Sequence, residues 1–573
     1  MNIFNYFETE FNKIVKDLKF AGNIPDVVDT SKVVFELPRD PSHGDIACNA
    51  AMALAKQVGM KPHDLAELLA VCLKSCDGVT AVEIAGPGFI NITVEPRLWS
   101  VELRTILAAG SRYGSNNIGA GKSINIEYVS ANPTGPLHAA HARGAVLGDS
   151  LAGLLEFNGW NVQREYYSND AGGQVDILAR SVYLRYQEAH GETIGEIPTG
   201  FYPGAYLKEV GAALAARDGE RYLTQDEEEW LAPLRTFAID SMMALIRDDL
   251  LRLGIQMDVF SSERALVENG AVQAAIDKLQ RDGHIYVGVL NPPKGKEPED
   301  WEPRQQLLFR ATAFGDDTDR PLRKSDGSWT YFSSDIAYHL DKLERTGGKL
   351  INIFGADHGG YVKRMMAAVE ALTGQKDMLH IKLCQLVNLM DNGNPVKMSK
   401  RAGNFVTISD VIDAVGADVI RFIMLTRRSD QTLDFDYAKV TEQSRDNPVF
   451  YVQYAHARCC SVLRQKGAVP DQANLERLTA PAELALIKLL VSWPRMVVSA
   501  AGSYEPHRIA FYLMDLASAF HSLWTAGRED PTLRFMLDGD SELTAARLWL
   551  VKATATVIRS GLGVLAIPAK EEM

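Results

Sequence analysis

The chain has 573 residues, of which 46% are hydrophobic and 23% charged, as in a folded soluble protein of three or four domains. Its formal net charge of −13 excludes a uniformly basic nucleic-acid-binding surface but not a local basic patch. The six cysteines form no C-x-x-C pair, so we expect neither a zinc knuckle nor a disulfide framework, and free thiols fit a reducing cytosol.

The first residues, 1–105, predict a small α+β domain. Near the start, apolar residues recur every three or four positions, as on one face of a helix: Phe4, Phe7, Phe11, Ile14 and Leu18. A short strand is predicted over 33–38, a helix over 61–74, and two strands within 79–94 around a Gly-Pro-Gly turn. The N-terminus lacks the apolar segment of a signal peptide, and no apolar run reaches the length that a membrane span needs.

Residues 106–445 alternate strand-like and helix-like stretches, which indicates parallel strands joined by crossover helices. We predict an α/β fold with a doubly wound, Rossmann-like parallel sheet. The predicted strands are 124–129, 349–355 and 382–390, and a helix runs from His138 to Phe157. The stretch 185–330 interrupts this alternation and is interpreted as insertions. From 446 to 573 only helical patterns remain, so a C-terminal all-α helix bundle is predicted.

Two histidines, His138 and His141, stand where the long helix is predicted to begin, after the strand 124–129. On position alone they could be a polar cap, metal ligands or phosphate ligands. Zinc helices usually space histidines at i and i+4 with a third ligand nearby, and neither condition is met here. A phosphate site fits better, because a helix start favours anions and lies at the carboxyl edge of the predicted sheet.

A second basic element is DNGNPVKMSKRAGN, at 391–404, which carries Lys397, Lys400 and Arg401 among Gly, Asn and Pro. Such a run is commonly no more than solvated surface. A loop with two lysines is also what an enzyme needs to hold pyrophosphate as it leaves.

Together the two elements resemble the signatures of class I aminoacyl-tRNA synthetases: HAAH at 138–141 resembles their HIGH motif, and KMSK at 397–400 matches their KMSKS motif. Further segments resemble arginyl-tRNA synthetases along nearly the whole chain: YYSNDAGGQ (166–174), YFSSDIAYH (331–339), FGADHGGY (354–361), GADVIRFIML (416–425) and NPVFYVQYAHAR (447–458). HGDIACNAAMALAK (43–56) and AGPGFIN (85–91) resemble the additional N-terminal domain of that family.

This resemblance implies a two-step reaction. The carboxylate of arginine attacks the α-phosphate of ATP, giving arginyl-adenylate and pyrophosphate, and the 2′-hydroxyl of the terminal tRNA adenosine then takes the arginyl group. It further implies ATP with Mg²⁺, L-arginine and an arginine-accepting tRNA as partners of a monomeric, cytoplasmic enzyme with no membrane association. A catalytically silent, tRNA-binding paralogue is the alternative, supported only by Ala140, which stands where the family motif has glycine.

By resemblance, four residues act on the phosphates: His138 and His141 in the transition state, and Lys397 and Lys400 on the β- and γ-phosphates. ATP would further contact Ala140, Gly355, Asp357, Met398 and Ser399. No metal ligands of the protein itself are expected.

The resemblance also gives an arginine pocket, formed by Glu127, Asn132, His141, Glu263, Tyr331, Asp335 and His358. Asp335 and Tyr331 would grip the guanidinium and Glu263 would add a second carboxylate, a geometry that suits lysine poorly. Glu127 and Asn132 would hold the α-amino end. Ordinary structural roles remain open: Asp335 as a helix cap, Tyr331 in the core, Glu127 facing solvent, and Asn132 as a turn residue.

For tRNA, the resemblance points to two regions. In the helical domain the candidates are Tyr451, Tyr454, His456 and Arg458, through aromatic stacking on unpaired bases and charge on phosphates. In the N-terminal domain they are Phe89 and Asn91. At least one of the tyrosines is expected to pack the bundle instead, and Phe89 could be ordinary strand core.

Overall fold

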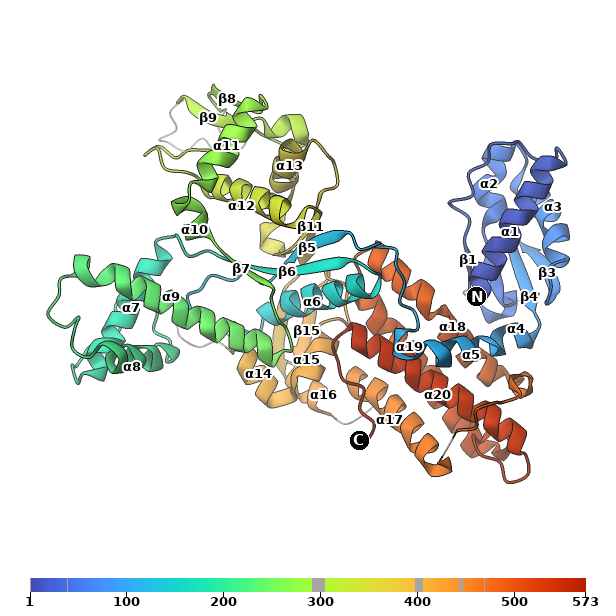
Figure 1. The fold of residues 1–573 in the computed structure, drawn as a ribbon. Coiled ribbons are helices and arrows are strands. Elements are labelled where there is room, and N and C mark those ends of the chain that lie inside the picture. The colour runs from blue at the N-terminus through green and yellow to red at the C-terminus, as the bar shows by residue number, and fades with distance from the viewer. Residues whose placement is uncertain (1, 39, 291–303, 397–405, 443–446, 468) are drawn as a thin grey trace.

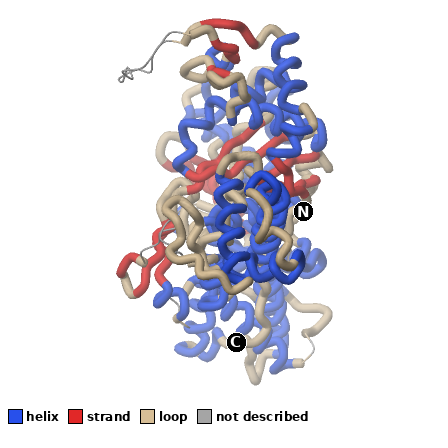
Figure 2. Tube along the Cα trace, turned by 90° about the vertical axis from the view of Figure 1, so that its left-hand side faces the viewer, coloured by secondary structure: helices blue, strands red, loops and turns tan. Residues whose placement is uncertain are grey.

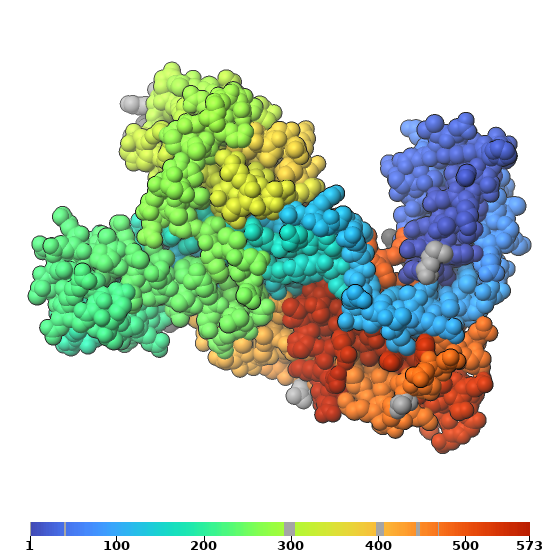
Figure 3. Space-filling model, in the orientation of Figure 1, coloured from blue at the N-terminus to red at the C-terminus, as the bar shows by residue number. Residues whose placement is uncertain are grey.

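The computed structural model describes the whole chain except residues 1, 39, 291–303, 397–405, 443–446 and 468. An N-terminal unit, a central unit built on a parallel sheet, and a C-terminal bundle of helices follow one another along the chain (Figure 1). Figure 3 shows the N-terminal unit standing apart from the central one, with an open notch between them. A cavity of about 1190 Å³ lies where the N-terminal unit meets the bundle, lined by Phe4, Glu36, Arg495 and Phe511 among others.

The N-terminal unit packs three helices on an antiparallel sheet ordered β1-β2-β4-β3. The predicted first helix is confirmed, although Val15 takes the core position expected of Ile14, which is only half-buried. The helix over 61–74 and the two strands within 79–94 are also confirmed, whereas the first strand is only two residues long. Its elements are α1 (Ile3–Phe20), β1 (Phe35–Glu36), η1 (Pro41–His43), β2 (Ile46–Cys48), α2 (Ala50–Val58), α3 (Pro62–Lys74), β3 (Val79–Ala85) and β4 (Phe89–Val94).

Three short helices connect this unit to the central sheet and lie against the C-terminal bundle: α4 (Pro96–Ser100), α5 (Glu102–Ala109) and η2 (Gly110–Arg112). The connection is anchored where the buried indole N–H of Trp493 donates to the carbonyl of Tyr113, at 2.8 Å. The next residue, Gly114, has φ +93°, and a Cβ there would lie 2.4 Å from the Trp493 nitrogen. Only glycine therefore fits at this junction without displacing the indole.

The central sheet has five parallel strands ordered β12-β11-β5-β6-β7, which confirms the predicted doubly wound fold. The chain moves outward from β5 to β7 on one side and from β11 to β12 on the other. Its direction switches between β5 and β11, and ligands bind beyond the carboxyl ends of the strands at such a point. The strands are β5 (Ser123–Glu127), β6 (Asn161–Ser168), β7 (Val259–Ser262), β11 (Lys349–Gly355) and β12 (Leu379–Cys384). Nearby helices are α6 (His141–Phe157), α12 (Tyr331–Thr346), η4 (Ala356–Tyr361) and α13 (Val362–Thr373).

Three predicted elements of this unit were wrong in extent. The stretch 382–390 is two strands, because the chain leaves the central sheet after Cys384 and joins a second sheet ordered β14-β13-β15. The helix predicted from His138 begins at His141, because the backbone of His138 is bridged to Thr407. The segment 185–330 is not one interruption, since β7 lies within it and forms the edge of the central sheet. The second sheet contains β13 (Val387–Asp391), β14 (Asn394–Pro395) and β15 (Leu433–Asp436).

The insertions are therefore two, one on each side of β7. The first is a helical arm with its own core, at the left of Figure 1: α7 (Gln174–Ala189), α8 (Tyr206–Asp218) and α9 (Glu227–Arg252). The second packs on α12 and α13 and contains α10 (Glu263–Glu268), α11 (Ala271–Arg281), β8 (Ile285–Gly288), β9 (Gln306–Phe309), η3 (Ala311–Phe314) and β10 (Arg320–Pro321).

The last part of the chain is helical, as predicted, and helices fill the lower part of Figure 2. By length and composition alone, α18 could cross a membrane, which the sequence did not suggest. A core helix of a soluble protein passes the same test, and α18 packs against α19 and α20. The elements from 446 onward are α17 (Pro448–Lys466), η6 (Leu475–Arg477), α18 (Pro481–Gly502), α19 (His507–Glu529), η7 (Pro531–Leu533) and α20 (Ser541–Val564). Three further helices precede them: α14 (Ile408–Val415), α15 (Ala417–Ile423) and α16 (Tyr437–Thr441).

We predict that Gly114→Ala destabilises the protein by about 3 kcal/mol, because it adds both a strained backbone angle and a steric clash with Trp493. Gly121→Ala is the matched control, since Gly121 also has a positive φ, +69°, but open space around its Cβ position. It should cost only about 1 kcal/mol. Thermal unfolding by calorimetry checks this, and equal midpoints for the two variants would contradict the role of the indole contact.

Candidate functional site

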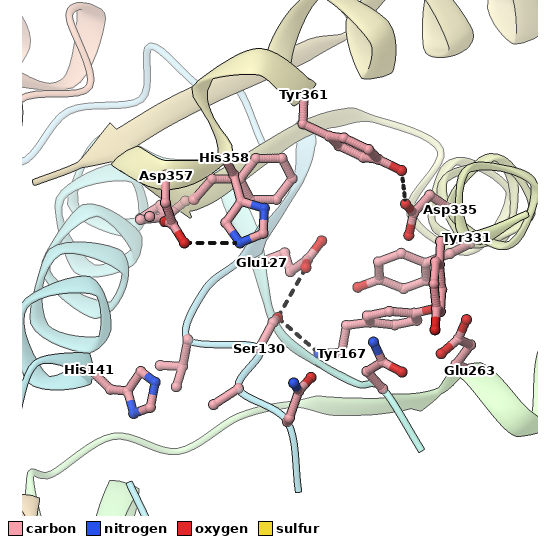
Figure 4. A pocket seen from close by; sticks show the side chains of 18 of the residues that line it. Glu127, Ser130, His141, Tyr167, Glu263, Tyr331, Asp335, Asp357, His358 and Tyr361 are labelled. Atoms are coloured by element: carbon pink, nitrogen blue, oxygen red, sulfur yellow. Dashed lines mark hydrogen bonds and ion pairs between the residues drawn. The ribbon is translucent and has the colours of Figure 1, made fainter. Parts of the chain in front are cut away.

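A cavity of about 720 Å³ opens at the carboxyl edge of the central sheet, where the strand order switches direction. Its walls come from segments far apart in the sequence (Figure 4). β5 ends at Glu127, Tyr167 lies on β6, Glu263 follows β7 directly, and α12 contributes Tyr331 and Asp335. The short helix after β11 closes the remaining side.

All seven residues of the predicted arginine pocket line this cavity: Glu127, Asn132, His141, Glu263, Tyr331, Asp335 and His358. Gly355 and Asp357, expected to contact ATP, line it too. The predicted Lys397, Met398, Ser399 and Lys400 lie outside the described residues. The structure thus brings together residues that are more than 200 positions apart in the chain.

Two carboxylates form an acidic wall. Asp335 accepts a hydrogen bond from the hydroxyl of Tyr361, yet its pKa is raised to about 7, chiefly by burial and further by the charges of Glu127 and Glu263. Glu263 is only 4% exposed, and burial raises its pKa as well. Its Oε2 atom has no hydrogen-bond partner among the described residues. A buried carboxylate oxygen requires a donor, so this wall is suited to a cationic ligand with several N–H groups.

The structure decides whether Tyr331 is a core residue and whether Asp335 is a helix cap. Tyr331 is 60% exposed, so it is not a core residue, and it stands one helical turn before Asp335 on α12. Asp335 is not the helix cap, because Thr330 holds that position and accepts from the backbone N–H of Ser333. Tyr167 stacks on Tyr338 with ring centroids 4.2 Å apart.

A buried polar network lies under the cavity floor. The ammonium group of Lys342, fully buried, donates to Glu127 Oε2 at 2.7 Å and to Asn352 Oδ1 at 2.8 Å. The amide of Asn352 lies 2.8 Å from His339 Nε2, and His339 Nδ1 lies 2.7 Å from the carbonyl of Asp335. Burial lowers the pKa of His339, which is therefore neutral and donates through Nδ1. Glu127 is thus buried and paired, not a solvent-facing strand residue.

The remaining oxygen of Glu127 accepts from the hydroxyl of Ser130 at 3.0 Å, and both residues border the cavity. Asn132 is exposed at the rim and donates to the side chain of Gln174 at 3.1 Å. His358 lies 3.7 Å from Asp357, both on the exposed side of the cavity. The end of the cavity formed by Glu127, Asn132 and His358 therefore carries less negative charge than the acidic wall.

The two histidines stand at the start of α6, with stacked rings whose centroids are 3.6 Å apart. The backbone N–H of His138 donates to Nδ1 of His141 at 3.3 Å. Ala140 caps the helix with φ −65°, a conformation that any residue adopts, so the absence of the motif glycine strains nothing in the backbone.

The histidine segment is joined to the residues that follow the lysine loop. The N–H of Ala139 donates to the carbonyl of Val406, and the N–H of Ile408 to the carbonyl of Leu137, each at 2.9 Å. His138 and Thr407 lie opposite each other in this short antiparallel bridge. Direct backbone pairing thereby holds residues 137–139 against residues 406–408, which lie more than 260 positions further along the chain.

The residues predicted to contact tRNA differ in their exposure to solvent. The ring of His456 is fully buried and hydrogen-bonded to the carbonyl of Lys570 at 2.8 Å, so it presents no surface to a ligand in this structure. Asn91 is also buried, whereas Phe89 is 39% exposed and is not strand core. Tyr451 and Tyr454 are half-buried on α17.

Arg458 lies over the rings of Tyr454 and Trp524, at 4.3 and 4.9 Å, and donates to the Tyr454 hydroxyl at 2.9 Å.

Sequence reasoning missed Trp524, because it comes from another helix, α19. It also missed Tyr167 and Tyr361 as cavity residues, although both stand in segments that carry the family resemblance. Lys342 gave no signal, since a lysine in a helical pattern is normally exposed.

Comparison with known proteins gives three family models that together cover most of the chain. The arginyl tRNA synthetase N-terminal domain matches residues 5–94, the catalytic domain of class I (R) tRNA synthetases matches 102–442, and the DALR anticodon binding domain matches 452–573. The arginine–tRNA ligases of Parvibaculum lavamentivorans and Azorhizobium caulinodans are 54% and 55% identical, with full coverage of both chains in each case.

Among solved structures, a putative arginyl-tRNA synthetase from Campylobacter jejuni is 32% identical, with a TM-score of 0.73 over 84% of this chain and 100% of that one. The arginyl-tRNA synthetase of Thermus thermophilus has the same TM-score, 0.73, at 21% identity with full coverage of both chains, and supports the fold alone.

The buried pair under the cavity gives a stability prediction. Lys342→Met should destabilise the protein by roughly 3 to 5 kcal/mol, because it leaves the Glu127 carboxylate buried without its cation. The double variant Lys342→Met/Glu127→Gln should recover part of that loss, since no unpaired charge remains. Lys349→Met, at an exposed lysine on β11, is the control and should change little. Calorimetric midpoints measure all three, and a stable Lys342→Met variant would refute the argument.

Proposed function

The chain belongs to the arginyl-tRNA synthetase family and ligates arginine to tRNA in an ATP-dependent reaction, and from that premise we propose how its cavity divides among the substrates. The relatives that match along the full length are arginine–tRNA ligases, and none supports a catalytically silent paralogue. The two steps are arginyl-adenylate formation and transfer of the arginyl group to the terminal adenosine of the tRNA.

In this proposal the guanidinium of arginine binds at the acidic wall. The observation that carries the assignment is a pair of neighbouring carboxylates, the half-buried Asp335 and the buried Glu263, and Oε2 of Glu263 has no hydrogen-bond partner among the described residues. A guanidinium offers five N–H donors in a planar fork, enough for both carboxylates, with Tyr331 beside them. Lysine lacks that fork, and a neutral side chain would leave the carboxylates unpaired, so both are rejected.

The α-amino and carboxylate groups of arginine then lie toward the opposite end of the cavity. Glu127 and Asn132 would accept from the α-amino group. Lys342 already neutralises part of the charge of Glu127, which makes this end a weaker cation site than the acidic wall. Arginine is therefore bound in one orientation, with its carboxylate toward His141 and His358.

ATP would lie beside this end, with its phosphates at the start of α6. His138 and His141 would donate hydrogen bonds to the phosphates as charge develops, aided by the N–H groups of the first helical turn. Ala140, Gly355 and Asp357 would contact the nucleotide, and Lys397, Met398, Ser399 and Lys400 would act from the segment outside the described residues. The protein acts by positioning and charge stabilisation, without a covalent nucleophile.

Mg²⁺ is proposed to arrive with ATP, offsetting the charge of the triphosphate. Mg²⁺ usually keeps several waters and binds substrate phosphates instead of a cage made wholly of protein ligands. Among the described residues, no group of three or more His, Cys, Asp or Glu is placed so that it could hold a metal ion.

For tRNA, we retain Tyr451, Tyr454, Arg458 and Phe89 as the proposed contacts. The stacked Arg458 and Tyr454 offer a planar cationic surface to an unpaired base. A monomeric enzyme in the cytoplasm remains our proposal, and the six free cysteines are in keeping with a reducing compartment.

The arginine site can be tested by arginine-dependent pyrophosphate exchange in the presence of tRNA. Asp335→Asn and Glu263→Gln should each lower kcat/KM for arginine about 100-fold, because the guanidinium loses one of two buried charge partners. Asp341→Asn is the matched control: this carboxylate is on the same helix but pairs with Arg345 at the surface. Unchanged kinetics in both site variants would refute the assignment.

The raised pKa of Asp335 predicts that arginine binds less tightly at low pH. The carboxyl has a pKa of about 7 before arginine binds and must be ionised to hold the guanidinium, while Glu127, Glu263 and Tyr361 face it and Lys342 lies below. Affinity should therefore fall about tenfold from pH 8 to pH 6, with proton release on binding in that range. Calorimetry in buffers of different ionisation enthalpy measures both effects. Asp335→Asn should abolish them, and a flat profile in the unmodified enzyme would contradict the prediction.

A further inference from the structure

Asp249, near the end of the inserted helix α9, contacts both the segment that precedes His138 and the start of α14, which pair through their backbones. One carboxylate oxygen accepts from the backbone N–H of Leu137 at 2.9 Å, directly before His138. The other accepts from the hydroxyl of Ser409 at 2.6 Å, in the first turn of α14. Asp249 is only 4% exposed, so both contacts are shielded from water.

These contacts extend the backbone bridge between the two segments. Leu137 and Ile408 form its last hydrogen bond, and the Asp249 carboxylate then spans from Leu137 to Ser409, the residue after Ile408. Thr407 and Asp410 cap the start of α14 reciprocally, which fixes where that helix begins. The carboxylate therefore sets the lateral position of the histidine segment relative to α14.

The other polar contact between the two helices is of a different kind. Arg252 on α9 pairs with Asp413 on α14, but Asp413 is 70% exposed, and exposed pairs of this kind contribute little. Asp248, next to Asp249, is also exposed. Asp249 is thus a carboxylate whose burial raises its pKa and whose side-chain hydrogen bonds within the described part of the chain come from Leu137 and Ser409.

We propose that Asp249 is a positioning residue for adenylate formation, holding the backbone of Leu137 and His138 in register with the start of α14. It touches no substrate and acts through the His138 segment. The inference rests on the proposed role of His138 at the ATP phosphates. Because Asp335 and Glu263, the proposed ligands of the guanidinium, do not lie on the segments that Asp249 contacts, loss of Asp249 reduces the rate of the chemical step much more than the affinity for arginine.

The test is arginine-dependent pyrophosphate exchange with tRNA present. Asp249→Ala should lower kcat at least tenfold, Ser409→Ala should lower it several-fold, and KM for arginine should stay within about twofold in both. Asp249→Asn should restore part of the rate, because its amide can still accept from Leu137 and donate to Ser409. In the Asp249→Ala background, Ser409→Ala should have no further effect, since its partner is already gone.

Asp248→Ala and Asp413→Ala are the controls and should leave kcat unchanged. Calorimetric midpoints and arginine affinity, measured on every variant, identify any that is merely unfolded. A folded Ser409→Ala variant with full kcat, additive effects in the double variant, or an equal loss in Asp413→Ala would overturn the inference. His138→Asn separates the proposed role of His138 from that of Asp249. If His138→Asn is slow but the Asp249 and Ser409 variants are not, only the role of Asp249 is refuted. If His138→Asn is fully active, the role of His138 at the phosphates, on which the inference rests, is refuted.

Discussion

Like charges held close together in a partly buried cavity are the constraint on which this site depends. Burial raises the pKa of Asp335 to about 7, and the neighbouring charges of Glu127 and Glu263 raise it further in the same direction. The fully buried Lys342 offsets one of the three charges, at Glu127, and leaves the other two for a ligand. The cavity is therefore asymmetric: one end needs a cation, and the other is already close to neutral. Orientation of the amino acid follows from that asymmetry.

The parallel sheet explains how residues so far apart in sequence reach one cavity, but the sheet alone does not complete the site. Glu263 begins the second insertion, and the first insertion ends in the helix that carries Asp249. The first insertion ends where the chain enters β7, and the second begins where the chain leaves it. The carboxyl end of β7 lies at the cavity. The stretch that interrupts the α/β alternation in the sequence thus supplies one carboxylate that lines the cavity, Glu263, and one that contacts Leu137 and Ser409, Asp249.

The sequence predicts this molecule well where the information is local or belongs to a motif. The strand over 349–355 follows from apolar pattern alone, and the cavity residues follow from family resemblance. Side-chain direction and partners at a distance do not follow. His456 matched its neighbours on α17 in character, yet helical rotation turns it into the bundle, toward the C-terminal tail. In the sequence, Lys342 has the pattern of a surface lysine, because its partner Glu127 is 215 positions away and reaches it only in the folded chain. Such contacts depend on tertiary packing that no single segment encodes.

Ala140 likewise shows that a residue can differ from a family motif without a change in backbone geometry. A glycine in a signature motif is required by the backbone only if φ is positive or if another group approaches too closely for a Cβ. Here φ is −65°, Ala140 is the cap residue directly before α6, and its methyl group is only partly buried. The neighbouring residues Leu137 to Ala139 keep their backbone pairing with Val406 to Ile408. The substitution therefore leaves the backbone of this segment intact, and in the proposed binding mode any effect of the methyl group must come from direct contact with the nucleotide.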